Sequence, residues 1–305
     1  MIIREGSTVR ANNLRLGSGA GANEGRLTVE GEDIDGVQSD ITISNTASLG
    51  DGEMKVLDGA HANFLDLNIG EGGQTQVEVS GASFLDPNLP ARLNADKIRV
   101  GMEDFATLIV QTGGLVDCNE LSITSLATSG IGRLVVIDGI VDIDSMMRVS
   151  GDFQAGESVI IENQGTVSTG ALRLGDESTS DAAEIVVRNG TQAAAAALLV
   201  LNGNSAGECQ IGADGPGILR LENFATVAVT GAARIGGSAG GGEGLVEIIA
   251  DSAFNADDLF VGGASPGTIK LLTDTSRLNV GTSAIVNAGG RIELKESAHS
   301  LARAS

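Results

Sequence analysis

The chain has 305 residues, of which 44 are glycine and only 4 are proline, while aromatic residues make up 2% and neither tryptophan nor tyrosine occurs. Without large side chains the interior must be thin and filled by Val, Ile, Leu and Ala, which favours stacked strands with tight turns over a thick globular core. The formal charge of −21 repels phosphate backbones and anionic lipids, so we expect no nucleic-acid partner and no membrane insertion.

A targeting segment or membrane span is not evident. Residues 1–30 contain no basic stretch followed by an apolar one, and no apolar run approaches the roughly 18 residues that a membrane span requires. We expect a soluble chain without a signal peptide in this sequence. If the protein is exported, its targeting segments lie outside these residues.

One pattern recurs along the chain: a short strand of alternating residues, a turn, and a second strand. The first strands recur at intervals of about 25 residues, with two longer intervals. In chain order they are predicted at 27–29, 54–56, 77–79, 108–110, 134–136, 159–161, 185–187, 219–221, 246–248, 269–271 and 292–294.

The second strand of each repeat often closes as apolar-x-apolar-Gly. Glycine at the fourth position permits a positive φ, which lets the chain leave the strand sharply. These closing strands are predicted at 14–17, 67–70, 98–101, 172–175, 259–262 and 278–281.

The alternation determines the predicted fold. It places the two apolar residues of each strand on one face and the middle residue on the other. One repeat buries too little to be stable alone, so successive repeats must stack around a shared core. We predict an all-β fold, a right-handed parallel β-helix (β-solenoid) of about 12 rungs. It would form a single domain over residues 1–295, with 296–305 as a C-terminal tail or cap.

Stacking in register would align the middle residues of the first strands in one outward column. Lys55 would then lie beside Glu78, and alternating charges would continue from Arg220 onward, which stabilises parallel stacking because like charges would oppose it. The full column reads Thr28, Lys55, Glu78, Ile109, Val135, Ile160, Val186, Arg220, Glu247, Lys270 and Glu293.

The centre of this column is apolar over four successive rungs, at Ile109, Val135, Ile160 and Val186. Two interpretations are open. Either a loop of the chain, such as the segment after Ala197, covers these side chains, or a partner or second copy buries them. Because contiguous apolar surface tends to mark an interaction site, we name the four residues as interface candidates.

A second outward column holds arginines. We interpret these arginines as ordinary outward residues that pair with acidic side chains. The alternative, a stripe that binds an anionic polymer, is less favoured. The column contains Arg15, Arg99, Arg148, Arg173 and Arg234.

Enzymes on parallel β-helices mostly cut polysaccharides with paired carboxylates on an exposed face. The candidate pairs are Asp142 with Asp144, and Asp257 with Asp258. The spacing of the first pair is that of any solvated strand face, and no tryptophan or tyrosine is present to stack on a sugar ring. We therefore predict no catalytic site. A polysaccharide-active enzyme, such as a tailspike-like depolymerase or lyase, is the alternative.

Metal and cofactor signals are weak. Cys118 and Cys209 lie on different repeats, which argues against a disulfide and a thiolate metal site. His61 and His299 lie near opposite ends of the chain, which argues against a histidine metal site and a Ser-His-Asp triad. The Gly-rich segment 237–244 lacks the Lys-Ser/Thr of a phosphate loop and is interpreted as a turn between rungs. No cofactor is predicted.

Two insertions interrupt the repeat. The first spans roughly 84–96 and holds Pro87 and Pro90, and the second spans roughly 202–217 and includes Cys209. Loops on a rigid scaffold vary freely, so these insertions are the best places for a specific function.

Two segments carry a resemblance to a known family. Residues 14–29 read Leu-Arg-Leu-Gly-Ser-Gly-Ala-Gly-Ala-Asn-Glu-Gly-Arg-Leu-Thr-Val, and residues 233–248 read Ala-Arg-Ile-Gly-Gly-Ser-Ala-Gly-Gly-Gly-Glu-Gly-Leu-Val-Glu-Ile. They resemble the Gly-rich β-helix repeats of autotransporter passenger domains and related bacterial surface proteins. The resemblance covers nearly the whole chain, through a degenerate structural motif.

This resemblance implies a parallel β-helix that is exported to the cell surface or extracellular space and often serves adhesion or self-association. It carries no catalytic residues. The leading hypothesis is a structural or adhesive module that binds copies of itself, as a homo-oligomer or filament, or another surface protein.

Overall fold

The computed structural model describes residues 1–17, 24–123, 130–151, 158–176, 181–188, 197–201, 209–236 and 241–295. The chain divides into two compact units, Met1–Asp144 and Ser145–Ser305. Over these described ranges no helix forms, so none there is long and apolar enough to cross a membrane. The single domain over 1–295 stays a prediction, and the tail at 296–305 lies outside the described residues.

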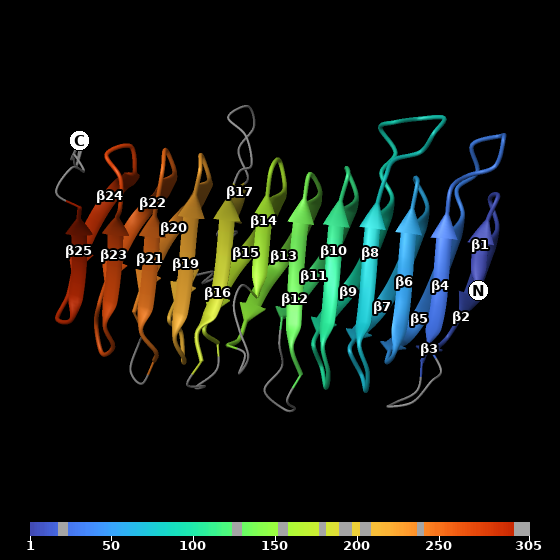
Figure 1. Cartoon of the computed structure of the whole chain (residues 1–305), viewed down its shortest axis with the longest axis horizontal. Helices are drawn as coiled ribbons and strands as arrows, with labels where there is room; N and C mark the ends of the chain where they lie inside the picture. The colour runs from blue at the N-terminus through green and yellow to red at the C-terminus, as the bar shows by residue number, and fades with distance from the viewer. Residues whose placement is uncertain are drawn as a thin grey trace. The chain divides into compact units, whose positions relative to one another are not determined.

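The first unit is built from two parallel sheets, to which each coil of the chain contributes in turn (Figure 1). The first sheet has the order β1 (Ile2–Arg4), β4 (Gly25–Glu30), β6 (Gly52–Leu57), β8 (Thr75–Ser80), β10 (Ala106–Gln111) and β12 (Gly132–Ile137). In the second sheet, β2 (Thr8–Ala11) and β3 (Leu14–Leu16) both pair with β5 (Asp40–Leu49), followed by β7 (His61–Ile69), β9 (Arg92–Val100) and β11 (Leu115–Ile123). The division between the units falls inside β13 (Ile140–Val149).

The second unit repeats this arrangement. Its first sheet runs β14 (Val159–Glu162), β16 (Ala183–Arg188), β19 (Gly217–Glu222), β21 (Gly244–Ile248), β23 (Gly267–Leu271) and β25 (Gly290–Leu294). In its second sheet, β17 (Ala197–Leu201) and β18 (Cys209–Ile211) both lie between β15 (Thr166–Leu174) and β20 (Thr226–Ile235), which is followed by β22 (Ala253–Val261) and β24 (Arg277–Val286). The predicted parallel β-helix with its repeat of about 25 residues is confirmed in both units.

Alternation along each strand fills the core as predicted. In β6, Met54 and Val56 are buried and Lys55 between them faces outward. Residues in equivalent positions align from coil to coil, so Leu108 pairs with Val77 on one side and Leu134 on the other. Each fully buried aliphatic side chain stabilises the fold by about 1.5–3 kcal/mol, which is why a thin core repeated many times suffices.

The strands of the second sheet are longer than predicted and change direction midway. In β7, Ala62 and Phe64 face inward, then Leu65 and the next residue both face outward before the alternation resumes at Leu67. Two successive outward residues mark a corner in the strand, and the pairing register of β5 with β7 shifts there after Ile43. In β7, β9, β15 and β22 the sequence pattern identified only the second half of the strand, because the first half lacks the closing glycine.

One predicted closing strand is wrong. Leu278–Gly281 belongs to the first half of β24, since Leu278 pairs with Phe254, whereas the closing half ends at Val286, which pairs with Val261. Both halves alternate with a period of two, so apolar-x-apolar-Gly does not distinguish them. The sequence pattern also missed β1.

Candidate functional site

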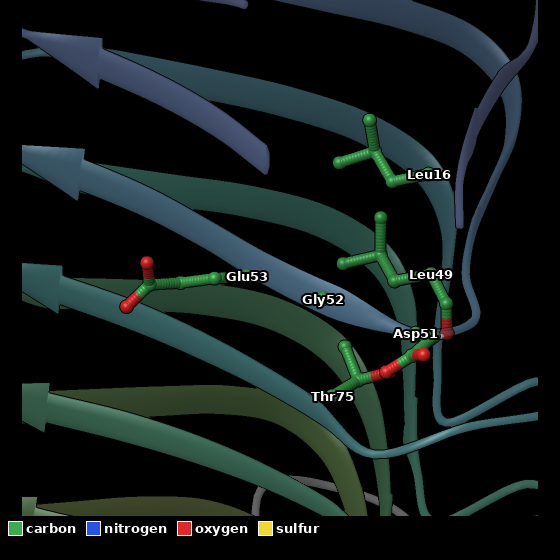
Figure 2. A pocket seen from close by; sticks show the side chains of 6 residues that line it. All are labelled: Leu16, Leu49, Asp51, Gly52, Glu53 and Thr75. Atoms are coloured by element: carbon green, nitrogen blue, oxygen red, sulfur yellow. Dashed lines mark hydrogen bonds between the residues drawn. The ribbon is translucent and has the colours of Figure 1, made fainter. Parts of the chain in front are cut away.

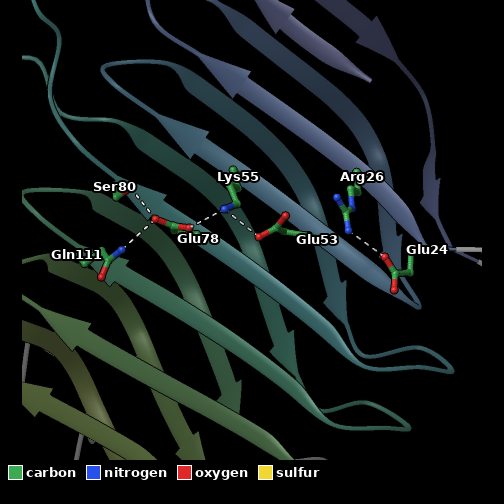
Figure 3. Close-up of polar contacts among 7 residues, drawn as sticks. All are labelled: Glu24, Arg26, Glu53, Lys55, Glu78, Ser80 and Gln111. Carbon is green, nitrogen blue, oxygen red and sulfur yellow. Dashed lines mark hydrogen bonds and ion pairs between the residues drawn. The ribbon is translucent and has the colours of Figure 1, made fainter.

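The predicted outward column of the first sheet is present in the first unit, where its polar members bond to one another (Figure 3). Lys55 Nζ lies 2.9 Å from Glu53 Oε1 and 3.4 Å from Glu78 Oε2. Glu78 Oε1 also accepts hydrogen bonds from Gln111 Nε2 (2.9 Å) and Ser80 Oγ (3.0 Å). Burial by itself would raise the pKa of Glu78, but these partners lower it overall, so Glu78 stays ionised.

The second unit continues the pattern with the predicted alternation of charge. Glu247 lies between Arg220 and Lys270 in the register, and its two carboxylate oxygens are each 3.2 Å from one of these cations. Arg220 Nη1 also lies 2.9 Å from Glu184 Oε1 on the preceding coil. The column is therefore a ladder of ion pairs that ties successive coils together.

We expect Glu247→Gln to lower the free energy of unfolding by about 1 kcal/mol, because it weakens two cross-strand pairs that are each worth about 0.2–1 kcal/mol. The loss should shrink as sodium chloride is raised, since salt screens partly exposed pairs. Urea unfolding at low and high salt measures this effect. Asp274→Asn, which neutralises an exposed acid of the same unit, is the control for the change in net charge. A loss that is independent of salt would contradict the ion-pair explanation.

The four interface candidates of this column do not share one environment. Ile109 and Val135 pair with each other and are partly exposed. Ile160 and Val186 also pair, but both are buried, with 3% and 0% of their surface exposed. Of the two interpretations, cover by the chain itself therefore applies to Ile160 and Val186, while the interface interpretation stays a prediction for Ile109 and Val135. The alignment of the repeats gives each residue's position in the column, but it does not show which part of the chain covers that position.

Three residues of the predicted arginine column, Arg99, Arg148 and Arg173, bond to neighbouring polar side chains. Arg173 lies 2.5 Å from Asp176 and 2.8 Å from Asp214, and Arg148 lies 3.5 Å from Asp176. Burial raises the pKa of Asp176, and the two arginines oppose this rise. In the first unit, Arg99 donates to Asn68 at 3.0 Å. These contacts favour the interpretation as ordinary outward ion pairs over a stripe for an anionic polymer.

A ladder of amide and charged side chains on the second sheet was not predicted. Asn63 Nδ2 donates to Asp40 Oδ1 at 2.8 Å, and Asn94 Nδ2 donates to Asn63 Oδ1 at 2.7 Å. Arg92 continues the ladder, with its Nε 2.6 Å from Asn94 and its Nη2 2.5 Å from Asp117. The signal was the recurrence of asparagine at the third position of successive second strands, which an alignment of the first strands alone does not reveal.

The carboxylate pairs considered for catalysis do not form a cluster around a hollow. Asp142 and Asp144 both face solvent from β13, as their spacing predicts. Asp257 Oδ2 accepts from the backbone N–H of Gly231 at 2.9 Å, and Asp258 Oδ1 accepts from Ser283 Oγ at 2.6 Å. The second pair thus joins adjacent coils and has a structural role.

A small pocket in the first unit lies at the turn where the chain enters β6 (Figure 2). It leaves no room even for a water molecule, whereas ordinary small-molecule sites have volumes of roughly 300–1,000 Å³. The hydroxyl of Thr75, one of its polar groups, is already hydrogen bonded to the backbone carbonyl of Gly50. The lining residues are Leu16, Leu49, Asp51, Gly52, Glu53 and Thr75.

Metal-binding groups do not assemble in the described ranges, where no set of three or more His, Cys, Asp and Glu side chains could hold an ion. His61 lies half-buried on β7, where burial lowers its pKa, and His299 and residues 237–240 lie outside the described residues. Cys118 and Cys209 are buried free thiols.

We expect both thiols to resist alkylation by iodoacetamide at pH 8 in the folded chain and to react quickly once it is unfolded. Burial raises the pKa of Cys118 and of Cys209 from 9.0 to about 12, so the reactive thiolate is scarcely populated. Because the folded pKa lies above the unfolded one, the stability linked to these thiols is complete below pH 9.0 and is lost as pH rises toward about 12. Intact-mass measurement checks this, and rapid labelling of the native protein would contradict it.

Comparison with known proteins adds little. No protein-family model and no curated protein matches the chain. A solved structure of a hyper-glycosylated TibA fragment, with glycosylation catalysed by TibC, is similar at 15% sequence identity and a TM-score of 0.37. The match covers 98% of this chain and 86% of that chain. A similarity this distant carries no conclusion about function.

Proposed function

We propose that this chain is a non-catalytic structural or adhesive module of a bacterial surface or extracellular assembly, and that it associates with copies of itself. One observation carries the proposal: in the described ranges, outward polar side chains on both sheets bond to neighbouring coils, and no group of them lines a hollow that could hold a ligand. Bonds between neighbouring coils stiffen the β-helix. They also leave the outer faces of its sheets available for contact with another protein. The resemblance of the Gly-rich repeats to autotransporter passenger repeats supports the extracellular location.

The self-association surface is centred on Ile109 and Val135. They are neighbours in the register, both partly exposed, with the ionised Glu78 on the preceding coil. Two copies that place this patch against each other would bury four aliphatic side chains and would form a symmetric contact, the commonest kind between identical chains.

Sedimentation velocity over a wide concentration range tests this proposal. The unaltered chain should associate, and Ile109→Glu should shift it to the monomer, because each contact would bury an unpaired carboxylate. Thr28→Glu is the matched control, since it adds the same charge to the same column beside Lys55 and leaves the patch intact. Electron microscopy should show paired or filamentous particles that Ile109→Glu disperses. A chain that is monomeric at every concentration, or an Ile109→Glu variant that associates normally, would refute self-association through this patch.

A further inference from the structure

Two long connections of the first unit extend beyond the same end of its strands (Figure 1). Residues 31–39 join β4 to β5, and residues 81–91 join β8 to β9; we call them the loop pair. The predicted insertion at 84–96 corresponds to the second loop, although β9 begins earlier than that range implies. Large apolar side chains project from the loop pair into solvent: Ile34 (94% exposed), Val37 (52%), Phe84 (94%), Leu85 (54%) and Leu89 (39%).

The first loop is held in a defined shape by its own polar groups. An antiparallel bridge between Glu32 and Gln38 closes its base. At its tip, Asp33 Oδ1 accepts hydrogen bonds from the backbone N–H groups of Asp35 and Val37, both at 2.9 Å. The exposed Ile34 is therefore presented from an ordered turn.

The second loop is held in the same way. An antiparallel bridge joins Ala82 to Pro90, and Ser83 Oγ accepts from the backbone N–H groups of Leu85 (3.1 Å) and Asp86 (2.8 Å). Proline within the loop reduces its freedom further. The backbone around Phe84 is thus held in a defined turn, and the Phe84 side chain is exposed to solvent.

A carboxylate joins the two loops. Glu32 Oε1 accepts a hydrogen bond from the backbone N–H of Leu85 at 2.9 Å and another from Ser83 Oγ. The loops therefore form one surface, although about 50 residues separate them in the sequence. A surface that is ordered before binding loses less conformational entropy when a partner docks.

The exposure of Phe84 contrasts with the burial of two other phenylalanines. Phenylalanine occurs only 7 times, and Phe64 and Phe254 are buried in the core. Exposed apolar clusters of this kind mark interaction sites, because leaving them in water gives no stability to the fold.

The charge of the loop pair narrows the kind of partner. It contains four acidic residues, Glu32, Asp33, Asp35 and Asp86, and no lysine or arginine. Carboxylates around an apolar tip repel anionic lipids and nucleic acids, and they attract a surface in which lysine and arginine border an apolar patch.

We propose that the loop pair is the docking site for a protein partner whose apolar patch is bordered by lysine and arginine. Phe84 and Ile34 enter the apolar patch, and the four carboxylates meet its basic border. The inference extends the proposed adhesive function to a specific site, and it does not depend on self-association through Ile109 and Val135.

A synthetic amphipathic helical peptide of leucine and lysine serves as the probe, and its leucine and glutamate counterpart as the negative control. The unaltered chain should bind the lysine peptide and not the glutamate peptide. The double variant Ile34→Ser/Phe84→Ser keeps every charge and should weaken binding by about tenfold or more, as loss of central apolar anchors does. Ile140→Ser, which removes an exposed apolar side chain elsewhere on the unit, should bind like the unaltered chain. Hydrogen exchange should show protection by the peptide at 33–37 and 83–89.

Three outcomes would overturn the proposal. Equal binding by the unaltered chain and the double variant would mean that the peptide is attracted only by the overall charge of −21. Protection outside the loop pair would place the contact elsewhere. Binding to phosphatidylcholine vesicles that is lost in the double variant would identify the loop tips as a lipid site. The double variant should sediment like the unaltered chain, because its substitutions lie outside the Ile109 and Val135 patch. Failure of peptide binding would therefore not count against self-association, and failure of self-association would not count against peptide binding.

Discussion

Replacing Phe254 with alanine is expected to lower the free energy of unfolding of the second unit by about 3–5 kcal/mol. The ring is fully buried on β22, where it aligns with Val227 on one neighbouring coil and Leu278 on the other. Backbone ladders hold the coils at a fixed spacing, so they cannot move inward to fill the cavity that the missing ring leaves.

The control for this prediction is the same substitution at Phe84. That side chain is 94% exposed, so its removal should change stability by less than about 0.5 kcal/mol. Urea unfolding followed by circular dichroism gives the overall change, and hydrogen exchange at β20 and β22 shows whether the loss is local, because repeat arrays unfold in parts. Similar losses for the two variants would mean that Phe254 does not act as a core residue.

Gly101→Ala should be destabilising by about 2–5 kcal/mol, which combines a positive-φ penalty of about 1–2 kcal/mol with overpacking of about 1–3 kcal/mol. Gly101 has a φ of +81°, and a Cβ atom there would lie 2.2 Å from the backbone nitrogen of Gly132 on the next coil. Neither backbone can shift without breaking the ladder that joins β10 to β12.

Gly113 provides the matched comparison. Its φ is +78°, almost the same, but no atom lies within 4 Å of the position that a Cβ would take. Gly113→Ala should therefore cost only the conformational penalty of about 1–2 kcal/mol. Thermal unfolding of both variants measures the difference. Equal losses would show that the close approach of adjacent coils does not require glycine at position 101.

The repeat in the sequence was sufficient to predict the stacking register. The middle residues of the first strands align in the described pairs as predicted, from Thr28 beside Lys55 to Lys270 beside Glu293. This succeeded because a parallel coil brings equivalent positions together, so a spacing along the chain becomes a neighbour relation in space.

The candidate surfaces were less predictable. Ile109 and Ile160 occupy equivalent positions in the repeat, yet the first is partly exposed and the second is buried. The loop at 31–39 was missed because it adds few residues to its repeat, and its link to the second loop depends on one carboxylate, that of Glu32. Such contacts come from irregular segments, which the repeat does not describe.

The sequence by itself therefore determined the kind of fold, the order of the inward side chains and the alternating charges between coils, since these follow from a period of two within strands and about 25 between them. Only the tertiary structure decided the corner in the second-sheet strands, the covering of Ile160 and Val186, and the union of two acidic loops with exposed apolar tips. Periodic positions are governed by local geometry, whereas exposure and loop contacts depend on segments that meet only when the chain has folded.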